Sequence, residues 1–128
     1  MLKSLAYIAS GGALGALSRY LVTLGMIRWM GGEYPWGTLA VNVLGSFVAG
    51  FFWGILGQTT GSHRTQALFF IGVLGAFTTF STYALDSLNY AQSGQWGMAA
   101  GNVLANNVGA LIAVGAGFAL ARVFVKQA

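Results

Sequence analysis

The sequence predicts an all-α membrane protein with four transmembrane helices, of which the third is broken. Of its 128 residues, 56% are hydrophobic and only 6% are charged, whereas a soluble domain usually carries about 25% charged residues. A transmembrane helix needs roughly 20 apolar residues to cross about 30 Å of hydrocarbon. Four such segments take up most of the chain, at residues 4–26, 36–56, 66–90 and 96–124. We therefore expect a single membrane domain over residues 1–128.

The first predicted span, residues 4–26, contains one ionised side chain, that of Arg19. The apolar stretch is longer than the core of a signal peptide, which favours a permanent span. A charge inside the bilayer is costly and must reach water, a partner or the headgroups. Two readings of Arg19 follow: it faces a water-filled vestibule, where it attracts anions, or it extends to the membrane surface.

The second predicted span begins at Pro35 and Trp36, because proline suits a first helical turn and tryptophan suits the membrane interface. Thr38, Asn42 and Ser46 follow at a spacing of four and so share one helix face. Hydrogen bonds between helices would explain one or two of these polar residues. A stripe of three is also typical of a permeation path. Residues 58–64 read as a loop by composition.

The third predicted span is interrupted by Gly75, Thr78 and Thr79. Glycine and threonine are poor central helix residues, and hydroxyls offer the backbone other partners. A helix break around residues 75–81 would free carbonyls and amides in the middle of the bilayer, where an ion, water or protein must satisfy them. Carbonyl oxygens that converge make a site for a hard cation.

Phe80 and Tyr83 are three residues apart and share one face of the second half of this span. Ring edges carry partial positive charge, so they help to hold a small anion without trapping it. The fourth predicted span adds a further polar stripe, Asn102 and Asn106, with Asn107 beside them.

Small residues recur at a spacing of four, which lets helices approach closely in lipid. These residues are Gly11 with Gly15, Gly50 with Gly54, and Gly97, Gly101, Ala105 and Gly109 in the fourth span. Contacts within one chain would explain them. Four short helices enclose little volume, however, so we also expect an oligomer.

The ionisable residues give no support to enzyme chemistry. His63 is the one histidine, Glu33 and Asp86 are the two acids, each expected near an interface, and cysteine is absent. No paired carboxylates, metal cluster or nucleophile–base pair can be assembled from this set. The six Lys and Arg residues are scattered singly, which argues against nucleic-acid binding.

The basic residues also give only a weak topology signal. Lys3, Arg64, Arg122 and Lys126 would lie on the side of the termini, and Arg28 on the other. Such a small bias is compatible with one fixed orientation or with insertion in both orientations.

The chain resembles the Fluc fluoride channels, also known as CrcB. Three stretches carry the resemblance: residues 11–20 (GGALGALSRY), 37–47 (GTLAVNVLGSF) and 75–83 (GAFTTFSTY). The third is the most specific, and the resemblance extends over essentially the whole chain. It implies a passive channel that selects fluoride over chloride and exports fluoride from the cytoplasm across the bacterial inner membrane.

The resemblance further implies an antiparallel, dual-topology homodimer with two pores. At its centre it implies a structural sodium ion (Na+), bound by the main-chain carbonyls of Gly75 and Thr78. The family's pair of pore phenylalanines corresponds to Phe80 and Tyr83, and its pore asparagine corresponds to Asn42. With the polar stripes, the expected fluoride-binding residues are Asn42, Phe80, Tyr83, Ser81, Thr82, Thr38 and Asn106, and the vestibule residue is Arg19.

Tyr83 departs from the family pattern, in which the second aromatic residue is usually phenylalanine. Its hydroxyl enters the path, where it either donates to fluoride or bonds a neighbour and narrows the pore. We expect unchanged folding and dimerisation but reduced fluoride conduction relative to a phenylalanine.

The physical requirements of fluoride agree with this reading. The ion is small and strongly hydrated, so several donors must replace its water, and Asn42, Ser81 and Thr82 can donate. A path without full charges does not trap the ion. Two alternatives remain. A small multidrug-type exporter needs a glutamate in its first span, and residues 4–26 contain no acid. A non-transporting membrane scaffold would use the glycine faces only to assemble.

Overall fold

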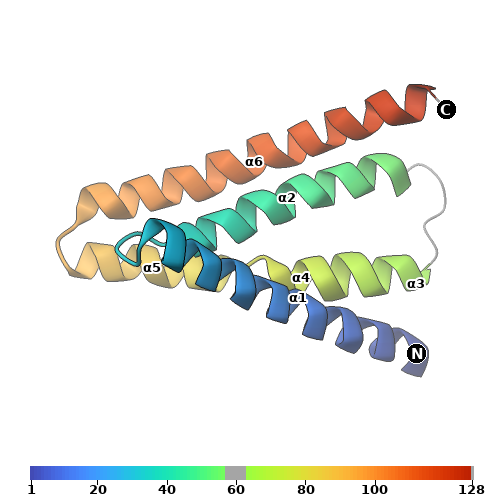
Figure 1. Ribbon diagram of the computed structural model, residues 1–128, viewed down its shortest axis with the longest axis horizontal. Helices are drawn as coiled ribbons and strands as arrows, with labels where there is room; N and C mark the ends of the chain where they lie inside the picture. Colours follow the sequence, from blue (N-terminus) through green and yellow to red (C-terminus); the bar gives the residue numbers. More distant parts are fainter. Residues whose placement is uncertain (57–62, 128) are drawn as a thin grey trace.

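The computed structural model is entirely helical in the part of the chain that it describes, residues 1–56 and 63–127, with side chains to residue 125. The helices form a bundle in which both chain termini lie at the same end (Figure 1). The elements are α1 (Leu2–Met30), α2 (Trp36–Leu56), α3 (His63–Thr65), the π-helical segment η1 (Gln66–Leu74), α4 (Gly75–Phe77), α5 (Phe80–Gln92) and α6 (Trp96–Gln127).

Helices α2 and α6 run in the same direction and form the largest interface of the bundle (Figure 1). Gly50 of α2 lies against the Val114 backbone, and Gly54 lies against Ala121. A Cβ atom at either glycine would collide with α6. The prediction that Gly50 and Gly54 mark a close helix contact is confirmed, because only glycine lets the two backbones approach this far.

Helix α1 packs against η1 through the other predicted pair of glycines. Gly11 lies against the backbone of Leu68 and Gly72, and Gly15 lies against Val73. Without side chains at these positions, α1 crosses the third helical segment at backbone contact, which places the second half of α1 beside the helix break.

The glycines at the start of α6 do not make the expected contacts within the chain. Gly97 and Gly101 have open space where a Cβ would stand. The buried face of α6 runs instead through Asn102, Asn106 and Ala113. Hydrogen bonding of the asparagines sets the rotation of this helix and turns Gly97 and Gly101 outward.

The predicted break in the third helical segment is confirmed. Helix α4 ends at Phe77, and Thr78 and Thr79 adopt extended conformations (φ −78°, ψ 157° and φ −149°, ψ 112°) before α5 begins at Phe80. Gly75 keeps a helical conformation (φ −62°, ψ −33°). The break therefore lies at the threonines, near the middle of the bundle (Figure 1).

Three helical segments within the described residues are long and apolar enough to cross a membrane: Trp36–Leu56, His63–Gln92 and Trp96–Val125. Large apolar side chains such as Leu17, Leu104 and Leu111 are exposed on the outside of the bundle. Lipid is the solvent that suits such a surface, so this is a multi-pass membrane protein.

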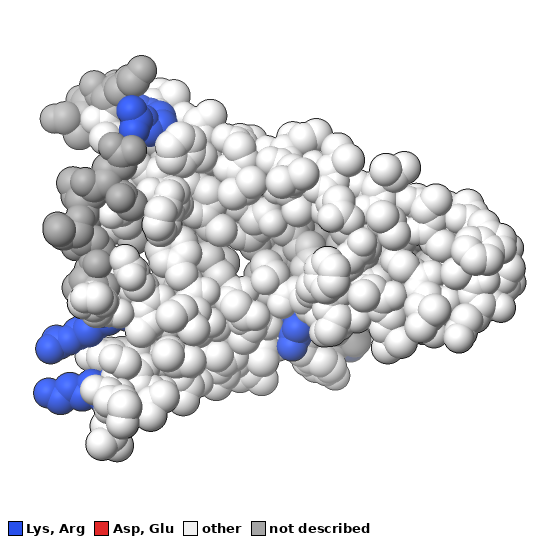
Figure 2. All heavy atoms as spheres, turned by 180° about the vertical axis from the view of Figure 1, so that it is seen from behind, with Lys and Arg blue, Asp and Glu red and all other residues white. Residues whose placement is uncertain are grey.

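Basic side chains gather at one end of the bundle, where the termini and α3 lie, with one further basic patch part-way along it (Figure 2). Of the predicted loop 58–64, residues 58–62 lie outside the described residues, as does the side chain of Lys126. His63 and Arg64 are helical rather than loop residues, since they form the first turn of the helix that continues into η1.

Candidate functional site

The candidate site is organised by Asn42, which binds both backbone groups of Thr79 at the helix break. The Thr79 amide donates to Asn42 Oδ1 at 2.8 Å, and Asn42 Nδ2 donates to the Thr79 carbonyl at 3.1 Å. The side-chain amide thus takes the place of the helical partners that the extended backbone has lost. It ties α2 to the break.

A chain of buried amides continues from Asn42 across the bundle. Asn42 Nδ2 also donates to Asn106 Oδ1 at 2.8 Å, and Asn106 Nδ2 donates to Asn102 Oδ1 at 2.9 Å. Asn102 Nδ2 then donates to Ser87 Oγ at 2.9 Å. Both amide protons of Asn42 are therefore used within the protein, and Asn42 acts on the site through Thr79 and Asn106.

The aromatic pair lies directly beyond the break. The rings of Phe80 and Tyr83 meet edge to face, with centroids 5.1 Å apart and an interplanar angle of 70°. Phe80 is 74% exposed and Tyr83 only 9%. Both line a cavity of about 320 Å³ with Asn42, Ser46 and Asn106, so the structure brings four of the sequence-predicted residues together.

Hydroxyl groups cluster around Thr79 at the start of α5. Thr79 Oγ1 accepts from the Thr82 amide at 3.2 Å and donates to Thr82 Oγ1 at 3.0 Å, and Ser81 Oγ lies 3.3 Å away. The first of these bonds caps α5, since it satisfies an amide of the first helical turn. The cluster holds three hydroxyls together just where the chain re-enters the helix.

Arg19 lies beside this hydroxyl cluster. Its half-buried side chain lines a cavity of about 370 Å³ together with Thr23, Thr38, Thr79 and Thr82. Thr79 also lines the cavity of the aromatic pair, so the two cavities meet at the break. A guanidinium at this position raises the local positive potential in front of a row of neutral hydroxyls.

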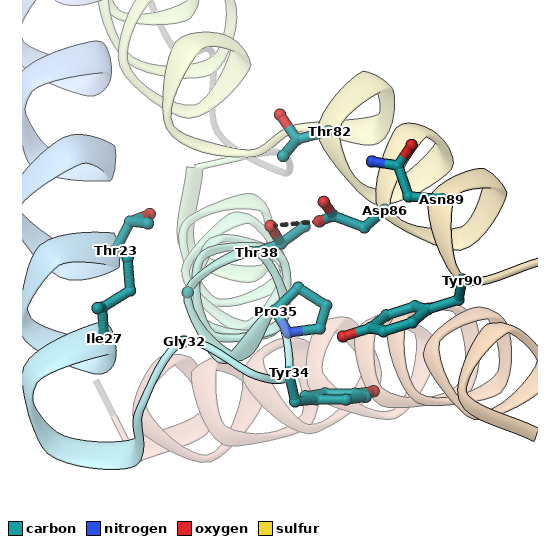
Figure 3. Close-up of a pocket in the computed structure, with 11 residues that line it drawn as sticks. Thr23, Ile27, Gly32, Tyr34, Pro35, Thr38, Thr82, Asp86, Asn89 and Tyr90 are labelled. Carbon is teal, nitrogen blue, oxygen red and sulfur yellow. Dashed lines mark hydrogen bonds between the residues drawn. The ribbon is translucent and has the colours of Figure 1, made fainter. Parts of the chain in front are cut away.

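A third cavity, of about 380 Å³, opens beyond Thr38 and Thr82 (Figure 3). Thr38 Oγ1 donates to Asp86 Oδ2 at 3.1 Å, and Tyr34 and Tyr90 stand on the far side. Partial burial raises the pKa of the Tyr34 phenol, which lies in the turn between α1 and α2.

The carbonyls of Gly75 and Thr78 have lost their regular helical donors. In a continuous helix they would accept from the amides of Thr79 and Thr82. Those two amides donate instead to Asn42 Oδ1 and Thr79 Oγ1. The break therefore leaves these two backbone oxygens without the amides that a continuous helix would supply.

Comparison with known proteins identifies the family. The model of the family described as "CrcB-like protein, Camphor Resistance (CrcB)" matches residues 6–118. The chain belongs to the CrcB-like family. The match includes the helix break, the amide chain and the aromatic pair, so the geometry described above lies within the family's shared region.

Relatives of this CrcB-like chain match it over most of its length. A protein of Magnetococcus marinus is 40% identical over 92% of this chain and 97% of its own. A protein of Legionella pneumophila (strain Lens) is 47% identical over 90% of this chain and 87% of its own. One of Agrobacterium fabrum is 42% identical over 93% of this chain and 96% of its own. All three are named "Fluoride-specific ion channel FluC".

Three residues of the CrcB-like site were not among the predicted fluoride-binding or metal-binding residues: Thr79, Asp86 and Asn107. Asp86 is four residues after Thr82, so the helical spacing alone places it on the same face as a predicted site residue. Thr79 precedes a helix start, a position that favours a capping hydroxyl. Asn107 gives no such signal, because its role depends on the rotation of α6 against α5.

Proposed function

We propose that this chain is a channel, not an enzyme, and that it passively exports fluoride across the bacterial inner membrane. Its family and the names of its relatives support this function. The observation that carries it is the broken third helix, with an aromatic pair and hydroxyls that line two cavities meeting at the break. Neutral donors and ring edges are the groups suited to a small, strongly hydrated anion.

The order of the cavities supports a path for the ion. Arg19 attracts fluoride into the cavity that it lines with Thr38 and Thr82, where the Thr82 hydroxyl, which accepts from Thr79 and can donate its own proton, replaces part of the hydration shell of the ion. The ion then passes the break at Thr79 and reaches the ring edges of Phe80 and Tyr83. Because the groups lining this last cavity are uncharged, the ion is held and then released.

The proposed assembly is a dual-topology antiparallel homodimer with four spans per chain and two pores. Helix α1, 29 residues long, reaches about 43 Å at 1.5 Å per residue, which is enough for a fourth span. Phe80, a proposed pore residue, is 74% exposed in the single chain. A second copy would close the path around Phe80.

The break also fits the proposed structural sodium ion. The Gly75 and Thr78 carbonyls lack their helical amide donors, and oxygen ligands of this kind suit a hard cation. When bound, sodium would supply a fixed positive charge that holds the break in shape. Two copies of the chain would contribute equivalent carbonyls at the centre of the dimer.

Fluoride efflux from liposomes that contain the purified protein tests the function. We expect rapid fluoride efflux that needs no proton gradient, and little chloride efflux from matched vesicles. A non-transporting scaffold would give no efflux of either ion. A multidrug-type exporter would move cationic drugs in exchange for protons, and neither result is compatible with the proposed channel.

A further inference from the structure

Tyr83 carries a hydroxyl whose only hydrogen-bond partner among the described residues is Asn107 of α6. Asn107 Nδ2 lies 3.0 Å from the Tyr83 hydroxyl oxygen and 2.8 Å from the Val103 carbonyl oxygen. A carbonyl accepts and never donates, so the end of the amide that faces Val103 is the nitrogen. The same nitrogen must therefore donate to the Tyr83 hydroxyl.

The direction of this bond determines where the Tyr83 proton points. A phenol oxygen that accepts from Asn107 directs its own O–H away from Asn107. Within the described part of the chain, no acceptor lies within hydrogen-bond distance of that O–H. Tyr83 is otherwise buried, and both residues line the cavity of about 320 Å³ next to Phe80. The cavity is the space open to the proton.

We propose that Asn107 is a positioning residue that turns the Tyr83 hydroxyl proton toward the permeating anion. Tyr83 is then an additional fluoride donor beside the ring edge of Phe80. This inference rests on the proposed channel function. A neutral O–H bonds a small anion strongly without a full opposite charge, so it slows the ion but does not trap it.

The Tyr83 hydroxyl is expected to tighten fluoride binding and to lower the maximal fluoride flux. Hydrogen bonds to charged groups are strong enough that losing one donor weakens binding about tenfold or more. Tyr83→Phe keeps the ring and removes only the donor. It is expected to raise both the half-saturating fluoride concentration and the maximal flux.

The test measures fluoride flux against fluoride concentration for the full-length protein in liposomes. Asn107→Ala is expected to raise the half-saturating concentration in the wild-type background and to have no effect on it in the Tyr83→Phe background. Asn107→Leu, which nearly preserves the side-chain volume, repeats the test if the alanine variant fails to fold. Tyr7→Phe on α1, outside the lining of this cavity, is the matched control and should change nothing.

Each outcome distinguishes the two proposals. Fluoride flux with the same half-saturating concentration in wild type and Tyr83→Phe would overturn the role of the hydroxyl. An equal effect of Asn107→Ala in both backgrounds would show that Asn107 acts only on packing and would overturn its positioning role. A wild-type protein without fluoride flux would overturn the proposed function itself, and this inference with it.

Discussion

At the scale of single residues, the site depends on side chains that replace the backbone hydrogen-bond partners lost at the helix break. Asn42 offers one acceptor and two donors, and the structure uses all three, on Thr79 and Asn106. An aspartate has the same shape but no donor, and it carries a negative charge. Position 42 is therefore sensitive to charge as well as to size.

Asn42→Asp is expected to abolish fluoride flux. The substitution removes the bonds to the Thr79 carbonyl and to Asn106, and it places a negative charge beside the path of an anion. Fluoride efflux from loaded liposomes measures the effect. Ser10→Ala on the exposed face of α1 serves as a control and should keep wild-type efflux. Normal efflux from Asn42→Asp would contradict the placement of the path.

At the scale of helical elements, the break is set by local chemistry that is visible in the sequence. Gly75 and two adjacent threonines, whose hydroxyls offer the backbone other partners, predicted a break within residues 75–81, and the structure has it at Thr78 and Thr79. Close helix contacts were predicted in the same way by two pairs of glycines, Gly11 with Gly15 and Gly50 with Gly54. In each case the signal lies in the residues themselves.

The features that the sequence did not predict depend on how one element is rotated against another. Gly97 and Gly101 have the same spacing as the other glycine pairs but face away from the bundle. Asn102 and Asn106 turn α6 inward instead, and this rotation brings Asn107 to Tyr83. A periodic pattern gives the faces of a helix but not the partner that each face meets.

Thr79→Val tests the cap at the break. Valine keeps the shape of threonine but leaves the Thr82 amide without its acceptor, so loss of this cap is expected to cost about 1 kcal/mol of unfolding free energy. Thr79→Ser keeps the hydroxyl and should stay close to wild type. Denaturant unfolding in detergent measures both variants, and equal stability of Thr79→Val and wild type would argue against the cap.

The adjacent glycines Gly11 and Gly12 give a matched pair for helix packing. A Cβ at Gly11 meets the Leu68 backbone, whereas a Cβ at Gly12 meets open space. Gly11→Ala is expected to lower the unfolding free energy by about 1–3 kcal/mol through overpacking. Gly12→Ala should be neutral or slightly stabilising. Similar losses in the two variants would mean that the contact between α1 and η1 is not what Gly11 provides.

At the scale of the whole molecule, a single chain leaves the proposed path incomplete, with Phe80 exposed at the cavity. The proposed sodium ion lies where two copies would meet, so it links the helix break to assembly. Replacing sodium by a large organic cation is expected to reduce both the dimer fraction and the fluoride flux. Size-exclusion chromatography measures the dimer fraction, and liposome efflux measures the fluoride flux. A dimer that forms equally well without sodium would contradict the proposed structural sodium ion.

The central claim is that neutral donors and ring edges at a broken helix conduct fluoride passively and in preference to chloride. The most direct measurement is the reversal potential of the reconstituted protein in a planar bilayer, with unequal fluoride concentrations on the two sides and chloride added so that the total halide concentrations are equal. The account predicts a current that reverses near the potential at which fluoride alone would be in equilibrium. A reversal near zero, with both halides equally permeant, or a membrane that carries no current would contradict it.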